Sequence, residues 1–136
     1  GFPGETADDF RLTYELARRV GFSDLHVFPF STRPGTTAAH FDDDVSSVTK
    51  SGRVAELIEL GTRTGAAFRA GLLGTTRPVL WEERRNGGWS GLTDNYVRVS
   101  SGSEIDLFNQ VVKTRLVSQS AGVVAGVPVP VGDVTG

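Results

Sequence analysis

The spacing of apolar residues changes near residue 74, and this change limits the chain to a fold with separate helical and β parts. Before residue 74, over residues 10–20 and 54–72, apolar side chains recur every three or four residues, which is the spacing of one helix face. After it they alternate in short runs between turn signals, as in strands. We therefore expect an α+β chain whose helical part is followed by a small, closed antiparallel β-barrel.

The first half of the chain predicts a helix followed by a buried strand. Thr6 is a candidate helix N-cap, Asp9 stands where a capping-box partner would be, and Gly21 is the expected stop. Residues 22–30 form a nearly continuous apolar run after the helix, which is typical of a parallel sheet covered on both faces. A second, connecting helix is expected over residues 51–73. This order favours part of a β/α barrel followed by a connecting helix.

The second helix and the linker before it each contain a further feature that the sequence allows us to interpret. Gly61 and Gly65 each cost about 1 kcal/mol relative to alanine within the second helix, so we expect them to permit close packing against a neighbour. The aspartates at 42–44 are interpreted as a solvated turn in a linker. A metal site is the alternative, although three adjacent carboxylates rarely converge from one loop.

The second half predicts short strands joined by tight turns. Asn86-Gly87 is a strong hairpin signal, and Asp94-Asn95 marks a further turn. The expected strands contain Val79–Trp81 and residues 89–93, 95–100, 111–117 and 122–129. Four or five such strands indicate a small closed barrel.

Composition excludes several classes of site. The 136 residues include no cysteine, so these residues hold no disulfide, no thiolate metal site and no cysteine-ligated iron–sulfur cluster. No apolar run approaches the roughly 20 residues of a membrane span, so we expect a cytoplasmic protein without a membrane partner. The net charge of -2 means that any RNA-binding surface has to be a local patch.

Two loops containing glycine and proline are candidates for ligand binding. "GFPGE" at 1–5 precedes the first helix, and "STRPGT" at 31–36 follows the predicted strand. In a β/α barrel, loops at the C-terminal face of the sheet carry the active site. Arg33 offers a bidentate fork for a carboxylate or phosphate. The alternative is that both are simple Pro-Gly turns, with Arg33 in an internal salt bridge.

The two histidines give little support for a metal site. His26 is expected to be a hydrogen-bonded core residue of the strand, and His40 is expected to be exposed. No nucleophile-elbow pattern accompanies a Ser/His/Asp combination. We therefore assign no catalytic residue and no metal ligand.

Alternation along the predicted strands places cations and aromatic residues on outward faces. Such an arrangement on a small barrel can bind single-stranded or looped RNA. Trp81 and Trp89 add flat surfaces, although Trp81 is expected to lie in the core. The candidate RNA-binding residues are Lys113 and Arg115 on one strand and Tyr96 and Arg98 on its neighbour.

Three blocks of sequence resemble one enzyme family. "GFPGETADDF" and "HVFPFSTRPGTTA" resemble a loop-helix and a strand-loop late in the radical S-adenosylmethionine (SAM) domain of tRNA methylthiotransferases of the MiaB/MtaB type. "GLTDNYVRV" at 91–99 resembles their C-terminal TRAM domain, closest to the subgroup acting on N6-threonylcarbamoyladenosine. The resemblance extends to about residue 129. It implies the end of the radical SAM barrel over 1–50, a connecting helix over 51–73, an RNA-binding TRAM domain over 74–129 and a flexible tail over 130–136.

The resemblance implies a function for the parent enzyme. That family uses SAM and two [4Fe–4S] clusters to add a methylthio group to carbon 2 of a modified adenosine beside the tRNA anticodon, and its TRAM domain is thought to hold the tRNA. The residues that match the border of the SAM pocket are Gly1, Phe2, Pro3, Gly4, Glu5, His26, Phe28, Ser31 and Arg33.

The chain departs from the family pattern in lacking the three-cysteine cluster motif. We therefore expect a piece of a longer polypeptide that by itself holds neither SAM nor a cluster and is inactive, with the missing N-terminal part of the enzyme as its partner. Two alternatives are a stand-alone RNA-binding TRAM module and a small α/β enzyme for a phosphorylated ligand. If the chain is such an isolated piece of the enzyme, residues 1–73 are expected to expose apolar barrel surface.

Overall fold

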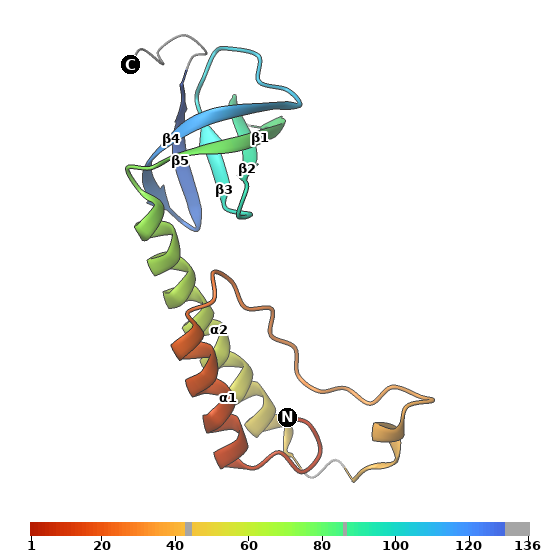
Figure 1. Ribbon diagram of the computed structural model, residues 1–136. Helices are drawn as coiled ribbons and strands as arrows, with labels where there is room; N and C mark the ends of the chain where they lie inside the picture. The colour runs from red at the N-terminus through yellow and green to blue at the C-terminus, as the bar shows by residue number, and fades with distance from the viewer. Residues whose placement is uncertain (43–44, 86, 130–136) are drawn as a thin grey trace. The chain divides into compact units, whose positions relative to one another are not determined.

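The computed structural model describes residues 1–42, 45–85 and 87–129, which form two compact units (Figure 1). The first unit is Gly1–Ala66 and the second begins at Ala67. Within the described residues, no helix is both long enough and apolar enough to cross a membrane. The element order is helical first and β afterwards, which confirms the predicted α+β class.

Helix α1, Ala7–Val20, begins and ends at the predicted residues. The Thr6 hydroxyl accepts a hydrogen bond from the Asp9 N–H at 3.1 Å, and the Asp9 carboxylate accepts one from the Thr6 N–H at 2.9 Å. These two bonds form the predicted capping box. The hydrogen bonds from Thr6 to the Asp9 carboxylate lower the pKa of Asp9. At the other end Gly21 adopts φ +67° and donates to the Ala17 carbonyl, as expected for a helix stop.

Helix α2, Ser47–Leu72, begins four residues earlier than the sequence predicts. Gly61 and Gly65 are both buried. A Cβ atom at Gly61 would lie 3.0 Å from the Leu25 Cβ, so only glycine lets this segment approach the helix so closely. The prediction of close packing is confirmed at Gly61.

Residues 22–30 form no β-strand, so this prediction is wrong. The only regular element between α1 and residue 42 is a 3-10 turn, η1, at Thr37–His40. A parallel strand needs neighbouring strands to satisfy its backbone N–H and C=O groups, and no described residue of this unit supplies one. The segment therefore remains a connecting chain between the two helices (Figure 1).

The first unit exposes apolar side chains, as the sequence predicts. Leu12, Leu16 and Val20 recur at intervals of four along α1, and each is more than half exposed. Phe10 and Ala17 are buried on a different side of the helix. Helix α1 therefore has one apolar face that is packed and a second that is open to solvent.

The second unit is a closed five-stranded barrel, as predicted. Its strands are β1 (Thr76–Arg85), β2 (Gly88–Thr93), β3 (Arg98–Ser101), β4 (Gln110–Ser120) and β5 (Val123–Pro128), in the spatial order β1-β2-β3-β5-β4. Every neighbouring pair is antiparallel except β3 and β5, which are parallel. A ring with an odd number of strands cannot alternate direction throughout. The prediction of a purely antiparallel barrel is therefore wrong at this one pair.

Large apolar side chains fill the barrel interior. Trp81 is fully buried and Trp89 is only 5% exposed, so Trp89 is a core residue and not a flat binding surface. Phe68, Leu72 and Leu73 pack against this core from the end of α2. The buried core residues are Val79, Trp81, Trp89, Val97, Val99, Leu107, Leu116 and Val124.

Residues with positive φ mark the connections of two hairpins in the barrel. Ala121 and Gly122 both adopt positive φ between β4 and β5, which is the requirement of a type I′ turn. Arg85 pairs with Gly88 across the β1–β2 hairpin, and Gly87 has φ +79°. Asn86, the first residue of this predicted turn, lies outside the described residues. So do two of the three linker aspartates, at 43 and 44, and the predicted tail at 130–136.

The tight interior predicts a large effect of one added methyl group. A Cβ atom at Gly126 would lie 2.6 Å from both the Thr114 Cγ2 and the Val99 Cγ1. Gly126→Ala is expected to lower the free energy of unfolding by about 1–3 kcal/mol, the usual cost of overpacking. Gly102→Ala is the control, because an added Cβ there meets nothing within 4 Å. Urea denaturation followed by tryptophan fluorescence checks this, and equal midpoints for the two variants would contradict the described interior.

Candidate functional site

The loop at residues 1–5 is attached to the rest of its unit by an aromatic cluster. The Phe2 ring lies 5.2 Å from the Phe30 ring and 6.1 Å from the Phe41 ring, both edge to face. The Lys50 ammonium lies 5.5 Å from the centre of the Phe30 ring. Phe2, Phe30, Phe41 and Lys50 therefore form an aromatic cluster that joins the loop at 1–5 to residues flanking the second ligand-loop candidate and to the start of α2.

Glu5 is held by two cationic groups. Its carboxylate accepts a hydrogen bond from Arg53 Nη1 at 2.5 Å and pairs with the Gly1 amino group at 2.7 Å. Arg53 also donates to the Glu5 carbonyl at 3.1 Å and lies over the Phe10 ring. Burial raises the pKa of Glu5, but the hydrogen bonds from the amino group and Arg53 outweigh it, and the pKa is lowered. Glu5 is therefore a structural anion here and not a proton donor.

The residues that match the family's SAM border are not gathered at one site. Gly1–Glu5 form a single turn in which the Glu5 N–H donates to the Phe2 carbonyl. Ser31 and Arg33 are exposed, and within the described part of the chain Arg33 forms no ion pair, so its predicted internal salt bridge is absent. Phe28 is 82% exposed.

His26 is also exposed, which makes its prediction as a hydrogen-bonded core residue wrong. Its side chain is 81% exposed, and its Nε2 lies 3.4 Å from the Asp24 carboxylate. The cause is the missing strand, because without a covered sheet at 22–30 no core forms around this side chain. His40 is exposed, as predicted.

The positions of these residues show whether this part of the chain could enclose SAM. His26 and Phe28 border a cavity of about 350 Å³ that is otherwise lined by largely apolar residues of α1, α2 and the segment 22–27. Gly1–Glu5, Ser31 and Arg33 do not line this cavity. The described residues also contain no cluster of three or more metal-ligating side chains. The residues present do not enclose a ligand of the size of SAM by themselves.

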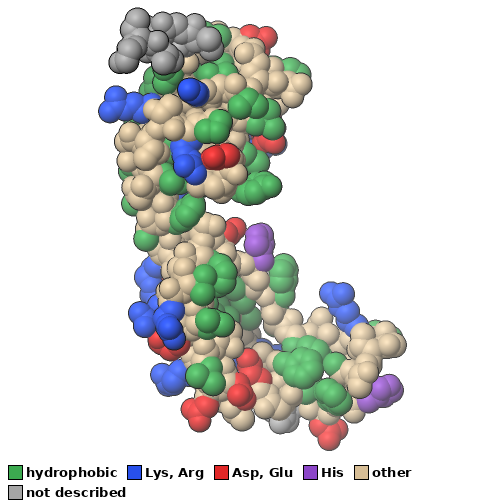
Figure 2. Space-filling view, viewed as in Figure 1, with side chains coloured by type: hydrophobic (Ala, Val, Ile, Leu, Met, Phe, Trp, Pro, Cys, Tyr) green, Lys and Arg blue, Asp and Glu red, His purple; other side chains and the backbone are tan. Residues whose placement is uncertain are grey.

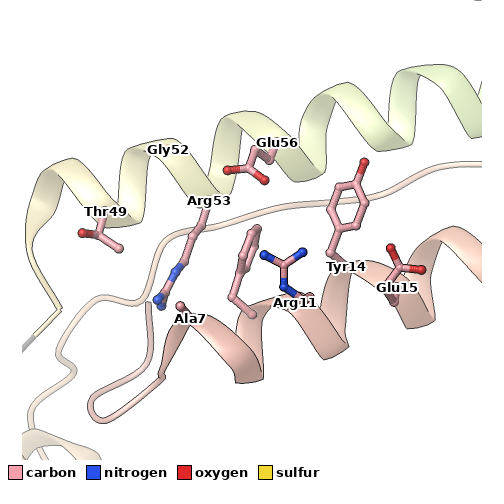
Figure 3. A pocket seen from close by; sticks show the side chains of 9 residues that line it. Ala7, Arg11, Tyr14, Glu15, Thr49, Gly52, Arg53 and Glu56 are labelled. Carbon is pink, nitrogen blue, oxygen red and sulfur yellow. The ribbon is translucent and has the colours of Figure 1, made fainter.

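A larger cleft of about 590 Å³ lies between α1 and α2 (Figure 3). Arg11, Tyr14 and Glu15 of α1 face residues of α2 across it. From α2, Arg53 and Glu56 add one charge of each sign. Because its two arginines and two glutamates balance, the cleft does not select a charged ligand.

The barrel presents a continuous outer face over β4, β1, β2 and β3. Strand register aligns Val111, Leu80, Leu92 and Arg98 in one row across these four strands. Their neighbours along each strand point inward, because Val79, Trp81 and Val99 are buried. This row of residues is called the cross-strand row below.

Lys113 and Arg115 form a positively charged wall on β4 beside this row. They pair in register with Pro78 and Thr76 of β1, and both are exposed while Thr114 between them is buried. This confirms that the two cations share one face. Among the described residues neither has an ion-pair partner. By contrast, the arginines on the neighbouring strands are paired: Arg77 with Asp94, Arg84 with Glu104, Arg85 with Glu83 and Arg98 with Glu82.

The predicted grouping of Tyr96 with Arg98 needs correction. Tyr96 lies in the turn before β3 with φ +63°, and the Thr93 hydroxyl orders this turn by accepting from the Val97 N–H at 2.9 Å. The Tyr96 side chain is 86% exposed. Strand β3 does not neighbour β4, because β5 lies between them on one side and β1 and β2 on the other. By the shorter way around the ring, through β5, Arg98 is two strand spacings, roughly 10 Å, from β4, and Glu82 neutralises it.

Phe108 is an exposed aromatic residue that the sequence analysis missed. It lies just before β4 and is 64% exposed, while its neighbour Leu107 is 2% exposed. Two adjacent apolar residues ahead of an alternating strand cannot both face the core. The pair Leu107-Phe108 could therefore have indicated an outward-facing aromatic side chain.

Comparison with known proteins identifies several similar sequences. The chain is 41% identical over 127 residues to a tRNA-2-methylthio-N(6)-dimethylallyladenosine synthase of Sorangium cellulosum, covering 85% of this chain and 26% of the relative. It is 36% identical over 132 residues to the protein of the same name from Chloroflexus aurantiacus, covering 94% and 28%. It is 34% identical over 121 residues to the threonylcarbamoyladenosine tRNA methylthiotransferase MtaB of Bacillus subtilis, covering 85% and 27%.

The matched region is a limited part of each relative. The chain spans between 26% and 28% of the length of these proteins and corresponds to their C-terminal region. No family model matches the chain.

The Glu5–Arg53 pair predicts a pH-dependent contribution to the order of the loop at 1–5. Because the pKa of Glu5 is lowered, its contacts contribute stability above the usual value of 4.5 and lose it as the pH falls through the lowered pKa. Arg53→Met is expected to raise the pKa of Glu5 and to destabilise the unit by about 1 kcal/mol. NMR titration of the Glu5 carboxyl measures the shift.

Arg63→Met is the matched control, since Arg63 pairs with Glu59 on the exposed surface of the same helix. An unchanged Glu5 pKa in Arg53→Met would show that Arg53 does not hold this carboxylate in solution.

Proposed function

Because this chain belongs to the tRNA methylthiotransferase family, we propose that its β-barrel is a TRAM domain that binds tRNA for the whole enzyme. The enzyme would add a methylthio group to carbon 2 of a modified adenosine beside the anticodon, in the cytoplasm. The observation that supports this most strongly is similarity over 85–94% of the chain, which includes the barrel. Lys113 and Arg115 of β4, which form no ion pair with the described residues, give the barrel a site for phosphate contact.

The proposed substrate class is an adenosine modified on N6. The relatives' names include both N(6)-dimethylallyladenosine and threonylcarbamoyladenosine. The phrase at residues 91–99 favours the threonylcarbamoyl form, which is therefore the first substrate to test.

We propose that Gly1–Glu5, His26, Phe28, Ser31 and Arg33 border bound SAM only when further segments of the enzyme complete the cavity. The exposure of His26, Phe28, Ser31 and Arg33 supports this assignment, because these side chains are accessible to such segments. When bound, SAM would supply the methyl group and the radical chemistry of the reaction. The [4Fe–4S] clusters would be held by cysteines from outside these 136 residues, which contain none.

The tRNA-binding proposal predicts a change in salt dependence. Lys113→Ala with Arg115→Ala is expected to weaken tRNA binding and to reduce the slope of log K against log salt by about 1.4–1.8. The reason is that each lost phosphate contact releases roughly one counterion fewer. Fluorescence anisotropy with labelled tRNA at several salt concentrations measures the slope.

Arg18→Ala with Arg19→Ala is the control, because it removes the same charge from the last turn of α1 in the other unit. A control slope equal to that of the β4 double variant would mean that net charge alone, and not the β4 wall, attracts the RNA. Failure of the unaltered chain to bind any RNA at low salt would contradict the proposed function itself.

A further inference from the structure

We propose that Phe108, Val111 and Leu80 form a platform on which an unpaired RNA base stacks, while Lys113 and Arg115 hold the adjoining phosphates. This inference rests on the proposed tRNA binding and adds the site and the kind of RNA that it takes. The ligand is a single-stranded or looped segment, not a duplex.

The exposure of Phe108 is built into the loop that carries it. Leu107 is buried in the core immediately before it, and the Asn109 N–H donates to the Trp81 carbonyl at 2.9 Å immediately after it. The Phe108 N–H itself donates to the Asp106 carboxylate at 3.0 Å. With both neighbours fixed, the ring cannot turn inward without breaking the attachment of the loop. An aromatic ring held open in this way loses little conformational entropy on binding.

Exposed apolar side chains on the barrel wall would extend the platform beyond Phe108. Val111 is 67% exposed, and its register partner Leu80 is 39% exposed. Both belong to the cross-strand row, which continues onto Leu92 of β2. An exposed apolar surface next to an aromatic ring suits the flat face of a base, and stacking of this kind tolerates any base.

Positive charge lies directly beside the platform. Lys113 and Arg115 follow Val111 on the same face of β4, and residues two apart on a strand are about 6.6–6.8 Å apart. A base on the platform would therefore have its backbone within reach of two cations that have no described ion-pair partner. Figure 2 shows hydrophobic side chains interspersed with Lys or Arg side chains over the visible face of the barrel.

This combination favours single-stranded RNA over a duplex or an apolar protein partner. In a duplex the bases are stacked on one another and leave no free face for Phe108. An apolar protein surface would have to bury the charges of Lys113 and Arg115 without partners, which is costly. RNA matches both features, because its phosphates meet the cations and its unstacked bases meet the ring.

The test compares variants of the full 136-residue chain on two RNA probes, an anticodon stem-loop and a blunt duplex of equal length. Phe108→Ala is expected to weaken binding of the stem-loop about tenfold, as loss of one stacked base does, with the salt slope unchanged. Phe108→Trp should retain or strengthen binding. Ile105→Ala is the control, because it removes another exposed apolar side chain from the same loop. Circular dichroism confirms that each variant is folded.

The outcomes separate this inference from the function on which it rests. Loss of binding to both probes in the unaltered chain would overturn the proposed function. Normal binding by the unaltered chain, with equal affinity for Phe108→Ala or with no preference for the stem-loop, would overturn the platform alone. A Phe108→Ala variant that changed the oligomeric state but not the RNA affinity would assign this surface to a protein contact and also overturn the platform.

Discussion

The close packing inside the five-stranded barrel is the constraint on which the rest of the second unit depends. Gly126 has no space for a methyl group between Thr114 and Val99, so glycine at this position allows β5 to pair with β4 and β3 in the observed register. That register fixes the alternation along β4, because a shift by one residue would send every side chain to the opposite face. The outward direction of Lys113 and Arg115 is therefore a consequence of the core.

The pairing of backbone N–H and C=O groups explains why the two units differ. The barrel closes on itself, so each strand satisfies its backbone groups with neighbours in the same unit. The segment at 22–30 has the composition of a buried strand but no strand beside it among the described residues. Phe22, Phe28 and His26 of this segment are consequently open to solvent, together with an apolar face of α1. These exposed surfaces are apolar, as the interior of a protein is. The chain matches only about a quarter of the length of each relative.

The sequence was sufficient for features set by local chemistry. The Thr6–Asp9 capping box, the stop at Gly21 and the alternation of β4 all depend on residues close together in the chain, and all were predicted. Features that depend on residues distant in the chain were not predicted. The parallel pairing of β3 with β5 follows from ring closure, the burial of Trp89 from the shape of the interior, and the separation of Arg98 from β4 from strand order. The ion pair between Arg98 and Glu82 likewise could be found only from the fold. The outward direction of Phe108, by contrast, could have been predicted from its position beside Leu107.

The most direct test of the central claim is a map of RNA contacts on the whole chain. The backbone amides of the ¹⁵N-labelled protein would be followed by NMR while an anticodon stem-loop is added at low salt. The account predicts that the shifted amides concentrate on β4 and the loop at 102–109, with smaller changes across β1. Shifts concentrated on α1 and α2, or spread evenly over both units, would contradict the assignment of RNA binding to this wall of the barrel.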